Sequence, residues 1–223
     1  GLCLQATGVR GLNFQVQDWG KLGYQDAWDR QLEIHQMVRD GGPDTLVFVE
    51  HPAVYTLGAS FHSENLIHPE AWYAEQGIEI IRTDRGGDIT YHGPNQLVIY
   101  PIFDLNRHGR GLHPWVRNLE QVILNVASQF GLEPRLFPPH TGVWVGDRKL
   151  AAIGIKIKKW ISLHGIALNC SNDLSPFGWI IPCGIADYGV TSLSQETGRL
   201  VTPDEAKPKV IAAFQDVFSP RSI

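Results

Sequence analysis

The chain has 223 residues, of which 43% are apolar and only 19% are charged. That supplies enough apolar side chains for a buried core and too little charge for a disordered protein. Nineteen Lys and Arg against 23 Asp and Glu give a net charge of −4, so no basic excess is available for binding nucleic acid by bulk electrostatics. No apolar run reaches the roughly 18 residues of a transmembrane helix, so we expect no membrane partner.

Four segments follow a helical pattern, and we expect helices over residues 24–40, 69–77, 113–130 and 202–218. Glycines follow the first and third segments and end the second. The fourth opens with capping-box spacing, Thr202-Pro203-Asp204-Glu205, and Pro208 is expected to kink it or to move its start.

Short runs rich in β-branched and aromatic residues predict strands over residues 45–50, 53–57, 78–83, 96–102, 142–145, 150–158, 161–170 and 179–182. Gly146-Asp147-Arg148 is expected to form a tight turn between two of them. Because several runs follow one another without a helix, we predict an α/β (α+β) fold with a mixed, largely antiparallel β-sheet flanked by helices. No linker divides the chain, so we expect a single domain over residues 1–223.

The cysteines are Cys3, Cys170 and Cys183, too few for a disulfide framework in a chain of this length. They predict a reducing compartment and a cytoplasmic location, with an organelle matrix as the alternative because the chain begins at Gly1 rather than Met. Cys170 lies in an apolar strand run and is expected to be buried. No histidine or cysteine spacing matches a metal motif, so we expect no metal.

A glycine pair, Gly86-Gly87, lies between Arg85 and a run of hydrogen-bonding side chains. Adjacent glycines let a ligand approach the backbone closely, although an ordinary hairpin turn explains them equally well. The segment matches neither the G-x-G-x-x-G pattern nor a P-loop, so no motif supports nucleotide binding.

Cys183 lies between Pro182 and Gly184, at the end of an apolar run where the backbone must turn. A thiol fixed in such a turn can act as a nucleophile. The alternative is a small buried hydrophobe, which most free cysteines are.

Lys149 opens an apolar strand beside the turn at Gly146. If its stem is buried, its amine can exchange a proton or stabilise a thiolate; the alternative is a solvated residue at a hairpin end. The small residues Ala151, Ala152 and Gly154 leave room for a ligand or else permit tight packing.

Four motifs occur in a fixed order, and they are Arg85-Gly86-Gly87 with Thr90-Tyr91-His92-Gly93-Pro94; Arg148-Lys149-Leu150-Ala151-Ala152-Ile153-Gly154; His164-Gly165-Ile166-Ala167-Leu168-Asn169; and Pro182-Cys183-Gly184-Ile185 with Thr191-Ser192-Leu193. Together they resemble the lipoyl(octanoyl) transferases of the biotin/lipoate protein ligase superfamily, from about residue 12 to about residue 218. Asp88 stands where that family usually has Gln, and Asn95 where it has Gly. Asn tolerates a positive φ, so the turn at residue 95 is expected to persist.

The resemblance implies the catalytic-domain fold of that superfamily. It also implies transfer of an octanoyl or lipoyl group from acyl carrier protein to a lysine of lipoyl domains, such as those of 2-oxo acid dehydrogenase E2 subunits or the glycine cleavage H protein. It implies no cofactor beyond the phosphopantetheine arm of the carrier, and it assigns the acyl thioester to Cys183 and the supporting amine to Lys149. The substrate contacts it implies are Arg85, Gly86, Gly87, Asp88, Ile89, Thr90, Tyr91, His92, Ala152, Ile153, Gly154, Gly165, Ile166 and Ala167.

Three other functions fit parts of this pattern. An ATP-dependent lipoate–protein ligase shares the superfamily fold but needs no cysteine nucleophile. A non-catalytic module would bind acyl carrier protein or lipoyl domains without turnover. A cysteine hydrolase would release free octanoate without an acceptor protein.

Overall fold

The computed structural model describes residues 11–181 and 188–219, so Cys3 and the predicted Pro182-Cys183-Gly184-Ile185 motif lie outside the described residues. The described helices are α1 (Tyr24–Arg39), α2 (Glu70–Glu75), α3 (Leu112–Gln129), α4 (Leu193–Thr197) and α5 (Pro203–Phe218). The described strands are β1 (Gln15–Lys21), β2 (Thr45–Glu50), β3 (Val54–Leu57), β4 (Glu79–Arg82), β5 (Ile89–His92), β6 (Gln96–Ile102), β7 (Pro134–Phe137), β8 (His140–Val145), β9 (Arg148–Lys158), β10 (Ile161–Asn169) and β11 (Gly189–Val190).

The larger sheet has the order β1-β2-β6-β10-β9-β8-β7, with the short β11 added beside β9. The β1–β2 and β11–β9 pairs are parallel, and the other pairs in this sheet are antiparallel. This confirms the predicted mixed, largely antiparallel sheet.

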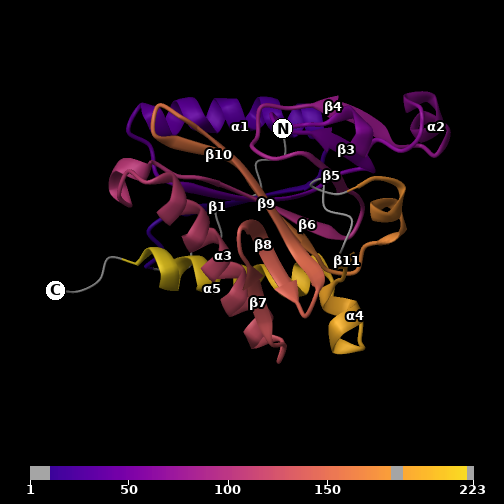
Figure 1. Cartoon of the computed structure of the whole chain (residues 1–223). Coiled ribbons are helices and arrows are strands. Elements are labelled where there is room, and N and C mark those ends of the chain that lie inside the picture. Colours follow the sequence, from indigo (N-terminus) through magenta and orange to yellow (C-terminus); the bar gives the residue numbers. More distant parts are fainter. Residues whose placement is uncertain (1–10, 182–187, 220–223) are drawn as a thin grey trace.

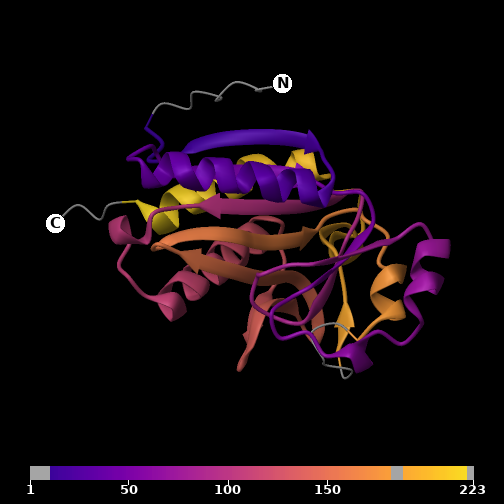
Figure 2. The same ribbon diagram turned by 90° about the horizontal axis from the view of Figure 1, so that it is seen from above.

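Helices cover both faces of this sheet (Figures 1 and 2). In β2, Leu46 and Phe48 join the core formed with α3 and α5, whereas Val47 and Val49 join the core under α1. Successive side chains of a strand point to opposite faces, so a strand covered on both sides is apolar throughout. That explains why residues 45–50 and 96–102 were predicted with the bounds that the structure shows.

The smaller sheet has the order β4-β3-β5 and lies beside α2 (Figure 1). Its core is aromatic: Tyr55, Tyr73, Tyr91 and Phe177 contact one another in tilted or edge-on pairs. Residues 84–88 join β4 to β5 within this sheet, and Gly86 in this segment contacts β9 of the larger sheet by donating to the Ile155 oxygen.

The predicted turns and caps are confirmed at particular residues. Gly146 has φ 60° in the β8–β9 turn, and Asn95 adopts φ 70° as expected. Thr202 caps α5 by accepting from the Glu205 backbone N–H, and Pro208 lies inside a helix that still begins at Pro203.

The strand expected over residues 179–182 is wrong over residues 179–181, the part of it that the structure describes. Trp179 ends a 3₁₀ helix (Ser175–Trp179), and Ile180 makes only an isolated bridge with Leu66. An apolar run of four residues does not distinguish a strand from an irregular segment packed on a core. The run is apolar because Phe177 and Ile180 fill the core of the smaller sheet.

None of the helices in the described part of the chain combines the length and hydropathy needed to cross a bilayer.

Candidate functional site

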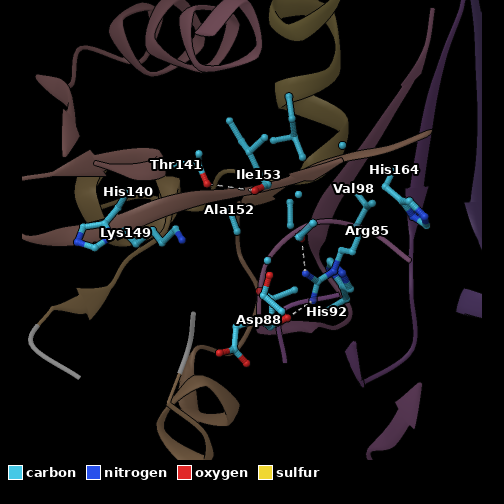
Figure 3. A pocket seen from close by; sticks show the side chains of 18 of the residues that line it. Arg85, Asp88, His92, Val98, His140, Thr141, Lys149, Ala152, Ile153 and His164 are labelled. Carbon is cyan, nitrogen blue, oxygen red and sulfur yellow. Dashed lines mark hydrogen bonds between the residues drawn. The ribbon is translucent and has the colours of Figure 1, made fainter. Parts of the chain in front are cut away.

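A cavity of about 350 Å³ lies between the two sheets, where residues 85–88 and β5 face β9 and β10 (Figure 3). The predicted residues that line it are Lys149, Arg85, Gly86, Gly87, Asp88, Thr90, His92, Ala152, Ile153, Gly154, Gly165, Ile166 and Ala167. Residues separated by as many as 82 positions in sequence therefore share one wall, from Arg85 to Ala167.

Ile89 and Tyr91 do not line this cavity, although the resemblance includes them among substrate contacts. They alternate along β5 with Thr90 and His92, so they point to the other face and join the core of the smaller sheet. Their contribution to the site is to hold β5 in place.

Arg85 shapes the glycine loop. Its guanidinium donates to the Thr56 backbone oxygen and hydroxyl, and to the backbone oxygens of Gly86 and Asp88, at 2.6–3.0 Å. The side chain is buried, and these bonds tie residues 85–88 to β3. The Arg85 guanidinium, which is predicted to contact substrate, thus also holds residues 85–88 in place.

The glycine loop packs directly on the backbone of β9. Gly86 N–H donates to the Ile155 oxygen at 2.8 Å, and a Cβ at Gly154 would lie 2.8 Å from the Gly86 oxygen. Only glycine at position 154 allows the loop this close to the strand. The predicted close packing is therefore confirmed at Gly154, and Ala152 and Gly154 also line the cavity.

A β-bulge turns Lys149 into the cavity. In the β8–β9 ladder, Val143 pairs with Ala151 but Trp144 pairs with Lys149, which leaves Leu150 as one extra residue in β9. Leu150 and Ala151 consequently both face the core on the α3 side. The extra residue puts Lys149 on the cavity wall together with Ala152.

Lys149 is buried, at 7% exposure, so the solvated hairpin-end alternative is wrong. Its amine lies 5.2 Å from the centre of the Trp144 ring and 5.9 Å from that of Tyr188, which also lines the cavity. Aromatic faces at these distances favour a cation. Lys156 and Lys158, farther along β9, are exposed as predicted.

His164 lies at the opposite end of the cavity from Lys149 (Figure 3). His164 Nε2 lies 2.7 Å from Asp84 Oδ1, Nδ1 lies 3.4 Å from the Tyr24 hydroxyl, and the backbone N–H donates to Gln31. These bonds hold a non-glycine residue at φ 61°, in the left-handed region.

Two more buried histidines surround this end. His92 stacks on Tyr24 and lies 2.8 Å from Gln96 Oε1, while His51 lies 2.7 Å from the Tyr100 hydroxyl. Burial lowers the pKa of His51 to about 4 and the pKa of His92 to about 3, and it also lowers the pKa of His164. All three rings are therefore neutral at pH 7.

Several lining residues were missed, and they are Tyr24, Ser60, His62, Val98, Tyr100, Pro139, His140, Thr141 and Tyr188. They come from α1, β6, β8 and separate loops, and no spacing along the chain connects them. His164 was named within a motif but not as a wall of the site.

The Asp88 carboxylate accepts four hydrogen bonds, from the His62 backbone and ring, from the Asn65 amide and from the Ile89 backbone, at 2.7–3.2 Å. Its hydrogen bond raises the pKa of His62. The negative charge of Asp88 is therefore balanced by hydrogen bonds within the rim of the cavity.

Both ends of the segment that contains Cys183 are anchored beside the cavity. Before it, Ile181 N–H donates to the Asn65 oxygen at 3.0 Å. After it, Val190 pairs with Lys149, and Thr191 N–H donates to the Lys149 oxygen at 2.9 Å.

Cys170 is buried, as predicted, and burial raises the pKa of its thiol to about 12. Within residues 11–181 and 188–219, no three His, Cys, Asp or Glu side chains are grouped so that they could hold a metal ion.

This fold, with a cavity between a glycine loop and a buried lysine, is shared with solved lipoate protein ligases. A solved bipartite lipoate protein ligase from Thermoplasma acidophilum superimposes with a TM-score of 0.72 at 15% identity, covering 92% of this chain and 84% of that one. At that identity the likeness concerns the fold.

The sequence comparisons are more specific. Residues 23–215 match the lipoyl protein ligase A/B catalytic domain. An octanoyltransferase from Geobacter sp. (strain M21) is 43% identical over 199 residues, covering 89% of this chain and 94% of the relative. One from Dictyoglomus thermophilum is 46% identical over 199 residues, covering 89% and 84%. The chain belongs to the lipoyl protein ligase A/B catalytic domain family, and these relatives in it are octanoyltransferases.

Proposed function

We propose that this protein is an acyltransferase that moves an octanoyl group from acyl carrier protein to a lysine of a lipoyl domain, in the cytoplasm and without a cofactor of its own. The observation that carries the proposal is the cavity, which joins a buried amine at one end to a slot partly lined by apolar and small residues. The octanoyltransferase relatives support octanoyl as the group transferred. The T. acidophilum ligase, whose structure is described together with its E2 lipoyl domain, supports a lipoyl domain as the acceptor.

Cys183 is the proposed nucleophile. Its thiolate attacks the carrier thioester, a new thioester forms on its sulfur, and the carrier leaves as a thiol. One thioester replaces another, so this step is nearly neutral in free energy. Cys183 is five positions before Tyr188, which lines the cavity, and five residues of fully extended chain span at most about 18 Å, a separation compatible with the proposed role.

Lys149 is proposed to support both half-reactions. As a cation it favours the Cys183 thiolate, and it then donates a proton to the departing carrier sulfur. The neutral amine that results accepts the proton from the incoming lysine, which must itself be neutral to attack. The attack forms the amide and releases the thiolate of Cys183. The Gly86 N–H already donates to Ile155, so the oxyanion must be held by other donors.

Apolar and small residues between the two ends suit an acyl chain. Val98, Ala152, Ile153 and Ala167 line the cavity, whose volume is in the range of small-ligand sites, about 300 to 1,000 Å³. Each buried methylene contributes about 0.8 kcal/mol, so the slot selects chain length only modestly.

Intact-protein mass spectrometry tests the proposal. After incubation with octanoyl-carrier, we expect one octanoyl adduct that hydroxylamine removes, that Cys183→Ser abolishes, and that disappears when a lipoyl domain is added. Cys170→Ser is the matched control and should retain the adduct.

The alternatives give different results. Transfer that requires ATP and survives Cys183→Ser would show a lipoate–protein ligase. Release of free octanoate without an acceptor would show a hydrolase, and binding of the lipoyl domain without turnover would show a non-catalytic module.

A further inference from the structure

The bulge at Leu150 determines where the Lys149 side chain points. The part of β8 that faces the bulge therefore contributes to the position of the Lys149 amine. Gly142 lies there with φ 130°. A Cβ at Gly142 would lie 2.9 Å from Lys149 Cε and 2.7 Å from the Ala151 oxygen. The backbone of Gly142 is thus packed directly against the stem of Lys149.

One side chain on a different element holds Gly142 in this position. Glu120 lies on the third turn of α3, is only 8% exposed, and its Oε2 accepts from the Gly142 N–H at 3.2 Å. This hydrogen bond connects α3 to β8 at the point where β8 touches the lysine stem. A carboxylate is an expensive group to bury for packing alone.

We propose that Glu120 is a positioning residue for Lys149, acting through its hydrogen bond to the Gly142 backbone. The hydrogen bond keeps the Gly142 backbone in contact with the Lys149 stem. That contact in turn holds the Lys149 amine between Trp144 and Tyr188. Neither the sequence motifs nor the resemblance point to Glu120, because it lies in the middle of an amphipathic helix.

The acceptor oxygen, rather than the negative charge, is the part of Glu120 that this role needs. Burial raises the pKa of the Glu120 carboxyl, which is consistent with a site that does not depend on a full charge. A glutamine has the same length and also presents an oxygen. Methionine fills a similar volume without an acceptor, and aspartate keeps the charge but is too short to reach Gly142.

The variants to compare are Glu120→Gln, Glu120→Met and Glu120→Asp, with Val122→Ala as the control for a destabilised α3. Val122 is fully buried on the same helix. The first measurement is acetic anhydride labelling of the folded protein, read by peptide mass spectrometry as the ratio of Lys149 to the exposed Lys156. In Glu120→Met and Glu120→Asp we expect this ratio to rise about tenfold, because a buried amide without its acceptor opens locally. Glu120→Gln and Val122→Ala should keep the ratio of the unchanged protein.

The second measurement is octanoyl transfer as a function of pH. Displacement of a positioned group by about 1 Å lowers kcat by up to about a hundredfold. We expect this loss in Glu120→Met with an unchanged KM for the lipoyl domain and a displaced pH–rate profile. A merely structural role would lower Tm and leave the profile in place, as Val122→Ala should.

The proposal is overturned if Glu120→Met and Glu120→Asp both fold and keep the labelling ratio and the pH–rate profile of the unchanged protein. It is also overturned if Glu120→Gln is as defective as Glu120→Met. The kinetic part rests on the proposed role of Lys149, whereas the labelling does not. If Lys149→Met were fully active, the proposed role of Lys149 would be rejected. Labelling of the Glu120 variants, which keep Lys149, would still test whether Glu120 positions the amine.

Discussion

The two ends of the cavity are built in contrasting ways. At one end, Lys149 presents an amine to two aromatic rings from a bulge in β9. At the other end, His164 lies within a hydrogen-bonded group of neutral rings. His164 pairs with Ile155, six residues beyond Lys149, so the ends lie about 20 Å apart along the strand.

The contrast separates reaction from recognition. A cationic group is placed where a thiolate and an amine are proposed to react. At the other end, where we propose that the acyl chain ends, the histidine rings are kept neutral by burial, and the charges of Asp84 and Arg85 are bonded to His164 and to backbone oxygens. Changes at the two ends should therefore have different readouts.

The largest expected effect is at the lysine end. Lys149→Met keeps the apolar stem and removes the amine, so we expect octanoyl transfer to fall by roughly 10² to 10⁴-fold, the usual contribution of a general acid–base group. Steady-state transfer to a lipoyl domain measures this. Lys156→Met, on the exposed part of the same strand, is the control and should keep full activity; equal activity in both variants would contradict the assignment.

The buried histidines at the other end of the cavity should make the free energy of unfolding depend on pH. In the unfolded chain His51 and His92 take up protons near their ordinary pKa of 6.5. In the folded protein His51 stays neutral down to about pH 4 and His92 down to about pH 3. The unfolded state binds more protons across this window, so the free energy of unfolding falls as the pH is lowered through it. The loss over the whole window is on the order of 3 kcal/mol for His51 and 5 kcal/mol for His92.

Urea unfolding across this window measures the slope, and His92→Gln should flatten it because one of the titrating rings is gone. An equal slope in both proteins would show that His92 is not responsible.

A smaller effect is expected where the glycine loop meets β9. Gly154→Ala places a Cβ 2.8 Å from the Gly86 oxygen, so the loop must move, at a cost of about 1 to 3 kcal/mol in stability. Thermal unfolding checks this against Gly178→Ala, where the added Cβ meets no atom within 4 Å. Equal melting temperatures for the two variants would show that the loop does not depend on this contact.

The sequence was most informative where one local rule decides the structure. The helix expected over residues 24–40 is α1, and Gly41 at φ 98° follows its cap. The run at residues 45–50 is β2 because both of its faces are buried. Asn95 takes the positive φ that its amide side chain tolerates.

Features that depend on contacts between distant segments were missed. β1, β5, β7 and β11 are short or polar, and their partners define them more than their own residues do. The bulge at Leu150 leaves no trace in composition, although it decides that Lys149 shares a face with Ala152. Arg85 was predicted as a substrate contact, and its role as a brace depends on Thr56, 29 positions away.

The two anchors that bracket residues 182–187 have a practical consequence for protein engineering. Ile181 and Val190 are held through backbone atoms, so the attachment points do not depend on which side chains lie between them. The intervening stretch can therefore be exchanged as a cassette with that of another octanoyltransferase while the frame stays the same. Chimaeras of this kind would allow segments that carry the proposed nucleophile to be compared on one scaffold.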